Sequence, residues 1–558
     1  MSARGLNLLV FREGRRIISA SALRFGLFRH LSSLINTDSA PHEPALNALL
    51  RAGELECAAA DVGADPHPFQ ALTGLLAESL LDPCRLPHLL VTIEYTDLRT
   101  SVEQALLPEL FTLSAPEGFA YYGLHPLAYA RVLEKLTPLR PRLVVIGIRT
   151  IGATLSAVCC AAAQKCGVQA ARFTVRPSGH PYDRRTKFSP EQAEFVQREA
   201  SAGADFLIVD EGPGLSGSSF LSVGEALVRA GVAHERTTLV TSHEPNVEAL
   251  CASGGAQRWR QFRSIAADSP ACKPEEAQIW IGSGEWRRYL LSRQACWPAS
   301  WLTFERPKYL SADDAADARL FKFLGLGHYG EQVFEREAQV AAAGFAPPPR
   351  MEHHGYASYP LIEGHPMRAE ELSESVLARI ASYCAFRAQH FGAEASQVDS
   401  LQQMAEHNLK ELRFEIPVKL QVERPVLVDA RMAPHEWLLT SSGQVLKTDS
   451  GSHGDDHFFP GVTDIAWDLA GAIVEWKMEH AQAELFLGMY HRASGDAAVS
   501  RIGEFIKAYA VFRCAYCMMA ANAMQGTEEQ ARLEQTAADY GTVLERFHSC
   551  QAQDIFKF

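Results

Sequence analysis

Residues 205–220 read Asp-Phe-Leu-Ile-Val-Asp-Glu-Gly-Pro-Gly-Leu-Ser-Gly-Ser-Ser-Phe, and this stretch decides the fold of the first half of the chain. The apolar run 206–209 ends in two adjacent acids, Asp210 and Glu211. A short loop of small residues follows, and 220–230 then has the pattern of a helix. The order of strand, acid pair, small-residue loop and helix predicts one unit of a parallel α/β sheet.

The same order of residues predicts a site for a sugar phosphate. Asp210 and Glu211 can accept hydrogen bonds from vicinal ribose hydroxyls. The backbone N–H groups of the loop and the positive end of the helix dipole can bind a phosphate. The predicted phosphate-binding residues are Gly214, Ser216, Gly217, Ser218 and Ser219.

Strands and helices alternate on both sides of this stretch, which predicts a parallel sheet with right-handed crossovers. Ligands of such sheets bind at the carboxyl ends of the strands. The expected strands are 143–148, 171–175, 206–209 and 237–241, and the expected helices are 153–165, 189–202 and 218–230.

Two further loops follow expected strands and carry groups for a pyrophosphate. Arg149, Thr150 and Gly152 come directly after the strand 143–148 and open a helix. The segment 176–187 is basic and rich in residues that break regular structure, so we expect a mobile lid. In this lid Arg184 and Arg185, with Arg176 and Lys187, can neutralise the charge of a leaving pyrophosphate.

Taken together, the acid pair and the three loops resemble a type I phosphoribosyltransferase over about 170 residues. The resemblance implies that Asp210 and Glu211 hold the ribose of phosphoribosyl pyrophosphate. It also implies that 214–219 bind its 5′-phosphate and that 149–152 bind pyrophosphate with Mg²⁺. The loop departs from the family pattern because it is one residue longer and its second acid is Glu rather than Asp.

The C-terminal part contains charged residues in the order that a kinase needs. Lys322 lies at the centre of the strand-like segment 319–323, Glu337 lies in the following helix, and Asp449 ends the strand 445–449. A kinase uses a lysine on the nucleotide phosphates, an acid that orients it and a carboxylate on Mg²⁺. The stretch resembles the aminoglycoside phosphotransferase and choline kinase family over about 240 residues, which implies ATP as a substrate.

The catalytic loop departs from that family. The family reads His-Gly-Asp, four residues, then Asn, whereas this chain reads Asp429-Ala-Arg431, four residues, then Glu436. Arg431 therefore stands where the resemblance implies a catalytic acid, and Asp429 is the remaining candidate. Glu436 could bind Mg²⁺ together with Asp449. The resemblance also implies that Asp468 holds the catalytic loop. No glycine-rich loop precedes Lys322.

Two other groups of possible ligands have open interpretations. His453, Asp455, Asp456 and His457 could bind a metal, but a polar loop near magnesium phosphates is the simpler interpretation. Cys514 and Cys517 have metal-like or redox-like spacing, but their apolar helical surroundings favour simple packing.

Length, charge and cysteine content limit the possible classes of protein. The 558 residues predict several domains: an N-terminal region of unknown role (1–90), a phosphoribosyltransferase-like domain (91–265), a connector (266–299) and a two-lobed kinase-like domain (300–558). The expected fold class is thus α/β followed by α+β. A net charge of −13 without a long basic run argues against nucleic acid or an anionic membrane as a partner. No apolar run is long enough to span a bilayer, and the scattered cysteines favour a reduced cytoplasm.

The predicted function is that of a bifunctional enzyme acting on small nucleotide-like metabolites. Its first activity would be magnesium-dependent phosphoribosyl transfer, and its second ATP-dependent phosphorylation of a small molecule. The alternative is a regulator that senses a nucleotide or phosphoribosyl pyrophosphate and has a non-catalytic kinase-like domain. Arg431 favours the alternative for the C-terminal part, whereas the intact pair Asp210 and Glu211 disfavours it for the first part. The sequence indicates neither the acceptor nor the oligomeric state.

Overall fold

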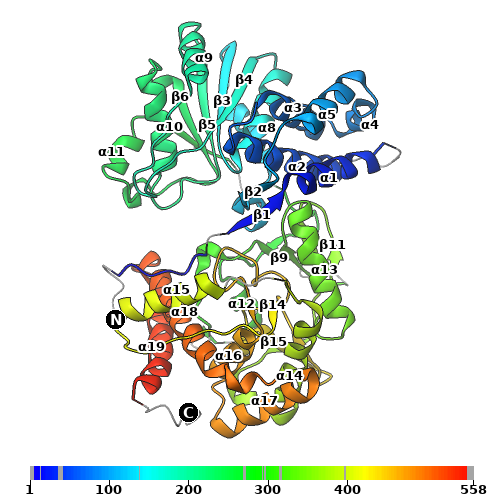
Figure 1. Cartoon of the computed structure of the whole chain (residues 1–558), viewed down its shortest axis with the longest axis vertical. Coiled ribbons are helices and arrows are strands. Elements are labelled where there is room, and N and C mark those ends of the chain that lie inside the picture. Colours follow the sequence, from blue (N-terminus) through cyan, green and yellow to red (C-terminus); the bar gives the residue numbers. More distant parts are fainter. Residues whose placement is uncertain are drawn as a thin grey trace.

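The computed structural model describes residues 6–12, 14–35, 42–136, 138–267, 272–291, 293–294, 297–312, 317–394 and 398–549. Figure 1 shows two parts, an α/β part at the top and a mixed part with many helices below, with the strands β1 and β2 between them. None of the described helices is long and apolar enough to cross a membrane. The chain is a mixed α/β protein with parallel and antiparallel sheets, as the strand–helix alternation predicts.

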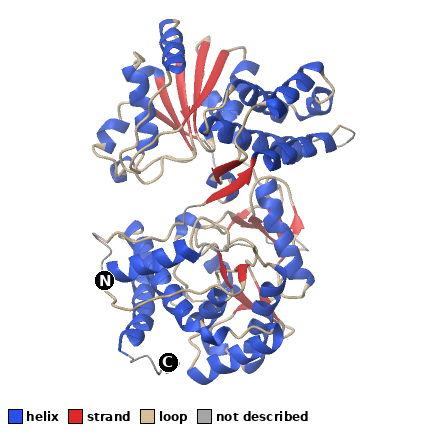
Figure 2. Cartoon of the chain, in the orientation of Figure 1, coloured by secondary structure: helices blue, strands red, loops and turns tan. Residues whose placement is uncertain are grey.

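A five-stranded parallel sheet forms the centre of the upper part (Figure 2). The strand order is β4 (Gln169–Val175), β3 (Arg142–Ile148), β5 (Asp205–Val209), β6 (Thr237–Thr241) and β7 (Arg263–Ala266). This confirms the predicted parallel sheet. From β3 the chain first adds β4 on one side and then β5 on the other. The order thus reverses between β3 and β5, and a crevice is expected at their carboxyl ends.

Helices cover both faces of this sheet. On one face α8 (Gly152–Lys165) packs with helices from the N-terminal region, and on the other lie α9 (Pro190–Ser201) and α10 (Ser218–Arg229). A capping box between Ser189 and Gln192 begins α9, as the sequence Ser-Pro-Glu-Gln predicts. A short helix, α11 (Gly255–Trp259), precedes β7.

The N-terminal region is mostly helical and shares its core with the sheet. Its elements are β1 (Arg15–Ser19), α1 (Ala20–Ser33), α2 (His42–Asp61), α3 (His67–Leu81), α4 (Leu86–Leu89), α5 (Ile93–Gln104), β2 (Leu110–Ser114), α6 (Glu117–Ala120) and α7 (Pro126–Lys135). β1 pairs with β2 in antiparallel fashion. The helices α2 and α3 pack on α8 through apolar side chains, so this region shares a hydrophobic core with the parallel sheet.

The first residues of the chain lie in the lower part. Leu8 and Val10 are buried in the core of the C-terminal helices, and Phe11 forms a β-bridge with Phe458. The predicted region 1–90 therefore contributes to both parts of the molecule, because its first residues cross from one to the other.

The lower part begins with a five-stranded antiparallel sheet. Its strand order is β11 (Arg350–Met351), β12 (Tyr356–Pro360), β10 (Arg319–Phe323), β9 (Lys308–Leu310) and β8 (Ile279–Trp280), and α13 (His328–Ala342) follows β10. The predicted connector 266–299 thus supplies one strand. It also carries α12 (Trp286–Leu290), whose buried Arg287 pairs with Glu529, with Nη1 2.9 Å from Oε1.

The remaining elements form a helical lobe with one three-stranded and one two-stranded antiparallel sheet. Its helices are α14 (Glu374–His390), α15 (Val398–Glu411), α16 (Ala466–Glu475), α17 (His480–Ser494), α18 (Ile502–Ala523) and α19 (Glu528–Ser549). Its strands are β13 (Gly364–Pro366), β14 (Pro425–Leu427), β15 (Trp437–Thr440), β16 (Val445–Lys447) and β17 (Val462–Asp464). Cys514 and Cys517 are buried in α18, where the thiol of Cys514 faces the carbonyl of Ala537, which agrees with a packing role.

Candidate functional site

The lower part brings together three charged residues that lie far apart in the sequence. Lys322 on β10 places its Nζ 3.3 Å from Oε1 of Glu337 on α13, and it also contacts the carboxylate of Asp449 just beyond β16. Lys322 and Glu337 are each only 3% exposed. Because buried charges are stable only when they are paired, this arrangement requires all three residues. The predicted phosphate-binding lysine therefore contacts both the acid predicted to orient it and the carboxylate predicted to bind the metal.

Besides Lys322, two further positively charged or protonatable groups lie close to Asp449. The Nζ of Lys308 lies 3.5 Å from Oδ2, and the Nε2 of His453 lies 3.1 Å from the same oxygen. Burial alone would raise the pKa of Asp449, but Lys322, His453 and Lys308 hold it well below its ordinary value. Asp449 therefore carries a negative charge at every physiological pH, as a metal-binding carboxylate must.

Glu436 lies near this group and is also held in its charged form. Its Oε2 is 3.8 Å from the Nζ of Lys447, and Asp449 is among the charges that act on it. Burial opposes ionisation of Glu436, but Lys447, His435 and His453 together outweigh it and lower the pKa. Two ionised carboxylates, Asp449 and Glu436, are thus available for a divalent cation.

Asp429 lies in a different environment. Its side chain is fully buried, accepts a hydrogen bond from the hydroxyl of Tyr383, and lies 3.4 Å from the Nζ of Lys447 and 3.8 Å from a guanidinium nitrogen of Arg387. A carboxylate so enclosed cannot contact a substrate in this structure. The structure thus shows Asp429 enclosed by Tyr383, Lys447 and Arg387, and its catalytic role stays a prediction.

Asp468 on α16 holds the loop that begins at Asp429 through hydrogen bonds to its backbone. Its carboxylate accepts hydrogen bonds from the backbone N–H groups of Asp429 (2.7 Å) and Ala430 (2.9 Å). This is the contact that the family resemblance implies for Asp468. Arg431 follows, with its guanidinium 5.7 Å from the centre of the Tyr516 ring.

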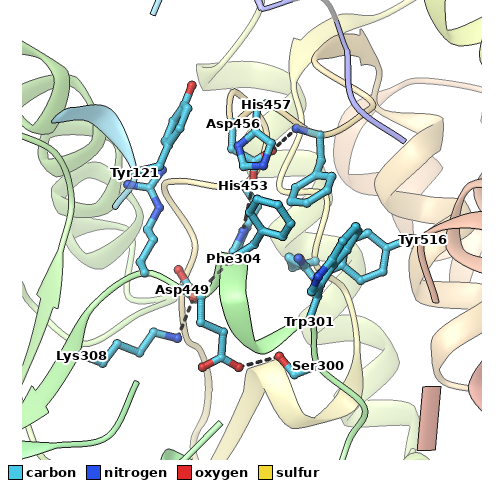
Figure 3. A pocket seen from close by; sticks show the side chains of 14 residues that line it. Tyr121, Ser300, Trp301, Phe304, Lys308, Asp449, His453, Asp456, His457 and Tyr516 are labelled. Atoms are coloured by element: carbon cyan, nitrogen blue, oxygen red, sulfur yellow. Dashed lines mark hydrogen bonds and ion pairs between the residues drawn. The ribbon is translucent and has the colours of Figure 1, made fainter. Parts of the chain in front are cut away.

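A cavity of about 60 Å³ lies beside Asp449 (Figure 3). Aromatic and charged side chains form its wall, and Tyr121 of the upper part contributes to it. The aromatic residues are Tyr121, Trp301, Phe304, His457, Phe458 and Tyr516. Pockets for drug-sized ligands have about 300–1,000 Å³, so this wall has to move before a nucleotide can enter. Sequence reasoning placed His453 and His457 near Asp449 but missed the other aromatic residues, because they come from separate segments of the chain.

The upper part holds a second candidate site at the reversal of strand order. Asp210 and Glu211 follow β5, and the half-buried carboxylate of Glu211 accepts a hydrogen bond from the backbone N–H of Gly118 in α6. Burial raises the pKa of Asp210 to about 7. The pKa of Glu211 is raised well above its ordinary value by burial and by the nearby carboxyls of Glu117 and Asp210. The acid pair is therefore poorly compensated and suited to a cation or to ribose hydroxyls.

The predicted phosphate loop is covered by the predicted lid. The hydroxyls of Ser216 and Ser218 donate to the carbonyl oxygen of Pro181, at 2.8 and 2.6 Å. Gly214 and Gly217 have φ values of 60° and 66°, which a side chain would disfavour, and Ser219 lies in the first turn of α10. One lid carbonyl thus occupies a position where two hydroxyls and a helix N-terminus converge.

The loop after β3 lies at the same edge of the sheet. A Cβ at Gly152 would lie only 3.1 Å from the carbonyl oxygen of Val209 at the end of β5, so the two loops are close together. Arg149 and Arg176 both bind Asp61 at the end of α2, with distances of 2.9 Å and 2.6 Å. A carboxylate therefore holds the two guanidinium groups that the sequence assigns to pyrophosphate.

The other predicted residues of these loops have local partners. The hydroxyl of Thr150 lies 3.4 Å from a guanidinium nitrogen of Arg176. Arg184 donates to the carbonyl of Gly179 within the lid at 2.8 Å, and the exposed Arg185 pairs with Asp183 at 3.2 Å. In this conformation Arg184 and Arg185 are thus bound within the lid itself, whereas Arg176 binds Asp61.

The two candidate sites are connected through α6 and the two tyrosines that follow it. The hydroxyl of Tyr122 lies 3.1 Å from Nε2 of His457, and that of Tyr121 donates to the carbonyl of Asp455 at 3.2 Å. Glu117 in α6 has its pKa raised to about 7 by burial and then by Asp456. A carboxyl group of the lower part, Asp456, thus raises the pKa of a carboxyl group of the upper part, Glu117.

No family model matches the chain, and no match was found among curated proteins. Among solved structures, choline kinase LicA from Streptococcus pneumoniae has 13% identity and a TM-score of 0.28, covering 42% of this chain and 89% of its own. A choline/ethanolamine kinase family protein from Mesorhizobium loti has 16% identity and a TM-score of 0.31, with coverages of 47% and 94%. The macrolide 2′-phosphotransferase MphH from Brachybacterium faecium has 15% identity and a TM-score of 0.30, with coverages of 46% and 95%. Scores this low carry no weight for function, so the case for phosphotransfer rests on the side chains described above.

Proposed function

We propose that the lower part of the protein binds Mg²⁺–ATP and transfers the terminal phosphoryl group to a small molecule. The observation that carries this proposal is the buried contact of Lys322 with both Glu337 and Asp449. A kinase needs a lysine held by an acid to neutralise nucleotide phosphates, and a nearby carboxylate for the metal. In this proposal Lys322 would bind the phosphates of the nucleotide, and Asp449 and Glu436 would hold the metal ion, which would neutralise phosphate charge.

The acceptor side of the reaction has no free carboxylate in the catalytic loop. Asp429 is enclosed, and Arg431 cannot accept a proton at neutral pH. Phosphoryl transfer passes through a loose transition state, so positioning and charge neutralisation supply most of the rate. We therefore expect slow turnover, since a well-placed base contributes about 10²–10⁴-fold where one operates.

The alternative for this part is a nucleotide sensor without turnover. Two observations favour it: the position of Arg431, and the cavity of about 60 Å³, which is too small for a nucleotide until its wall moves. Binding and turnover are separate quantities, so the two functions can be distinguished by experiment.

The test is calorimetric titration of Mg²⁺–ATP into the full-length protein, followed by an assay for ADP formation with candidate small alcohols and amines. We expect binding that is lost in Asp449→Asn and kept in Asp399→Asn, an exposed carboxylate on α15. Circular dichroism verifies that both variants fold. ADP formation supports the transferase, binding without ADP formation supports the sensor, and absence of binding by the wild-type protein contradicts both.

A second candidate function belongs to the upper part, which we propose binds phosphoribosyl pyrophosphate with Mg²⁺. Its support is the meeting of Asp210 and Glu211 with two loops at the reversal of strand order. In this proposal 149–152 bind the pyrophosphate and 214–219 bind the 5′-phosphate. The hydroxyls of Ser216 and Ser218 would then donate to phosphate oxygens in place of the carbonyl of Pro181.

Titration of phosphoribosyl pyrophosphate into the full chain tests this second proposal. Each hydrogen bond to a charged carboxylate contributes about 1.5–3 kcal/mol, so Asp210→Asn with Glu211→Gln should weaken binding at least tenfold. Equal affinity of wild type and double variant would contradict the assignment. Release of labelled pyrophosphate in the presence of candidate bases then separates a transferase from a sensor.

A further inference from the structure

Five side chains that can bind a metal lie together at the junction of the two parts. His42 and Glu43 begin α2, His125 precedes α7, Cys272 follows β7, and His354 lies in the turn between β11 and β12. Figure 1 shows α2 and β11 on the two sides of this junction. None of these residues belongs to either candidate site described above.

The ligand atoms are close enough to share one ion. Those of His125, Cys272 and His354 all lie within 4.8 Å of one another, and so do those of His42, Glu43 and His354. The two groups share His354. His125 is fully buried and Cys272 is only 8% exposed, so packing holds these two donors in place. The third donor, His354, is held by the turn between β11 and β12.

His125 has a buried nitrogen that nothing in the described part of the chain satisfies. Its Nδ1 lies 3.2 Å from the backbone nitrogen of Leu127, whereas its Nε2 has no hydrogen-bond partner among the described residues. Leaving a buried polar atom without a partner is costly, so such an atom usually has a ligand or a water. The free Nε2 therefore provides a second indication of a ligand, independent of the clustering.

Burial keeps the imidazole of His125 neutral. Its pKa is well below the ordinary value because of burial and because His354, His42 and Arg131 add positive charge nearby. A neutral imidazole is the form that coordinates a metal. Burial raises the pKa of the Cys272 thiol, and Arg131 opposes this effect by favouring the thiolate.

We propose that His125, Cys272 and His354 bind one transition-metal ion, and that Glu43 or His42 completes a four-coordinate site. Two imidazoles and a thiolate are the donor set of zinc sites, and a tetrahedral ion needs only one more ligand. On binding, the thiol of Cys272 releases its proton to solvent and its sulfur lone pair forms the bond to the metal. The charge of the ion offsets the charge of the thiolate.

Binding through Nε2 has a consequence for α7. The proton of the His125 ring must then reside on Nδ1, where it faces the N–H of Leu127. That N–H loses its acceptor, and the first turn of α7 gives up one capping contact. Because the ion joins the loop before α7 and the turn β11–β12, it would connect the upper part to the antiparallel sheet of the lower part.

Metal analysis of the full-length protein tests this inference. After purification from zinc-supplemented cells and dialysis against metal-free buffer, we expect one zinc ion per chain by plasma mass spectrometry. Replacement by Co²⁺ should give a thiolate-to-cobalt charge-transfer band in the near ultraviolet. That band reports directly on Cys272 and does not depend on any enzymatic activity.

Matched variants identify the ligands. Cys272→Ser with His125→Asn should lose the zinc and the cobalt band, whereas Cys251→Ser and His353→Ala, both exposed, should keep them. Chelation should lower the melting temperature of the wild-type protein and leave that of the double variant unchanged. If the double variant does not fold, the wild-type metal content still decides. Absence of zinc and of a cobalt band in the wild-type protein, or retention of both by a folded double variant, would overturn the proposal.

Discussion

At the scale of single residues, the carboxyl groups of this protein fall into two electrostatic classes. Asp449 is surrounded by Lys322, Lys308 and His453 and stays ionised. Asp210 and Glu117 have no comparable compensation, and burial raises the pKa of each to about 7. A carboxylate of the first class stays ionised at all times and is therefore suited to bind a metal ion. The second class gains most when a cation or a hydroxyl-rich ligand arrives, because only then is ionisation compensated.

Glu117→Gln should stabilise the protein at alkaline pH. The folded pKa of about 7 lies above the ordinary value of 4.5, so the folded state holds the proton more tightly. The contribution of Glu117 to stability is therefore full below pH 4.5, falls as the pH rises to 7 and stays low above it. Gln does not titrate and avoids this loss. Its gain should be about 1–2 kcal/mol at pH 8 and near zero at pH 4.5.

Denaturant unfolding of both proteins at the two pH values measures this difference. Glu94→Gln, which replaces an exposed carboxyl on α5, serves as the control and should show no pH-dependent gain. A gain at pH 4.5 as large as that at pH 8 would contradict the assigned pKa of Glu117.

At the scale of elements, α2 joins the two candidate sites. Its Asp61 binds Arg149 and Arg176 beside the predicted pyrophosphate loop. Near the other end of the helix, Asn47 accepts from the backbone N–H of His328 and donates to Glu331, both in the first turns of α13. A helix of 20 residues spans about 30 Å. The same rigid element thus contacts the upper site and the helix that carries Glu337.

Asp61→Asn should strengthen the binding of pyrophosphate. The substitution removes the carboxylate that competes with a phosphate for Arg149 and Arg176. One charged hydrogen bond contributes about 1.5–3 kcal/mol, so we expect roughly a tenfold lower dissociation constant. Titration calorimetry with Mg²⁺–pyrophosphate measures it, and Asp97→Asn on the exposed face of α5 is the control. A weaker affinity in Asp61→Asn would mean that Asp61 positions these arginines for binding.

The lid is a second element whose stability can be measured. Hydrogen bonds from Ser216 and Ser218 to the carbonyl of Pro181 help to hold it in place, together with a contact of 2.7 Å between the hydroxyls of Thr186 and Ser222. Each such bond contributes about 1 kcal/mol, so the double change to Ala should increase the open fraction by roughly tenfold or more. Trypsin should then cleave after Arg184 or Arg185 faster by the same factor.

Time courses of proteolysis followed by mass spectrometry identify the cleavage site. Ser201→Ala, on the surface of α9, should cleave at the wild-type rate. Unchanged cleavage at 184–185 in the double variant would show that other contacts keep the lid closed.

At the scale of the whole molecule, the lower part depends on segments from outside it. Residues 6–12 place Leu8 and Val10 in its core, and the segment before residue 300 supplies β8 and α12. Arg287 on α12 and Glu529 on α19 form a pair that is 4% exposed on both sides, with Nη1 2.9 Å from Oε1 and Nη2 3.0 Å from Oε2. A fragment that begins at residue 300 would lose all of these contacts.

Arg287→Ala should destabilise the protein strongly. It removes two hydrogen bonds from the buried carboxylate of Glu529, which keeps Arg532, 3.0 Å from Oε2, as its remaining charged partner. The cost should therefore approach, without exceeding, the about 3–5 kcal/mol that is typical of a buried charge left unpaired. The melting temperature of the full chain measures this effect. Arg288→Ala is a matched control because Arg288 is the next residue and its side chain is 65% exposed. Similar melting temperatures for the two variants would show that the pair contributes little to stability.

Local sequence pattern was enough to predict much of the fold and of both candidate sites. The strand before Asp210, the loop after it and the helix α10 follow from residue order and periodicity, because neighbouring residues determine these elements. Lys322, Glu337 and Asp449 were identified because a family resemblance fixed their order, and the structure brings them together. The roles assigned to these residues stay predictions until ligand binding is measured.

Other features depend on packing between distant segments and leave no trace in local pattern. One such contact is made by the carbonyl of Pro181, which accepts hydrogen bonds from two serine hydroxyls. Another is made by the carboxylate of Asp61, which forms ion pairs with two arginines. The same holds for Leu8 in the C-terminal core and for the group of His125, Cys272 and His354. Spacing cannot reveal a group whose members are more than 80 residues apart from one another. The sequence by itself determined the elements and the chemical type of the charged groups, whereas the tertiary structure decided which of those groups compensate one another, because burial and distance act through space rather than along the chain.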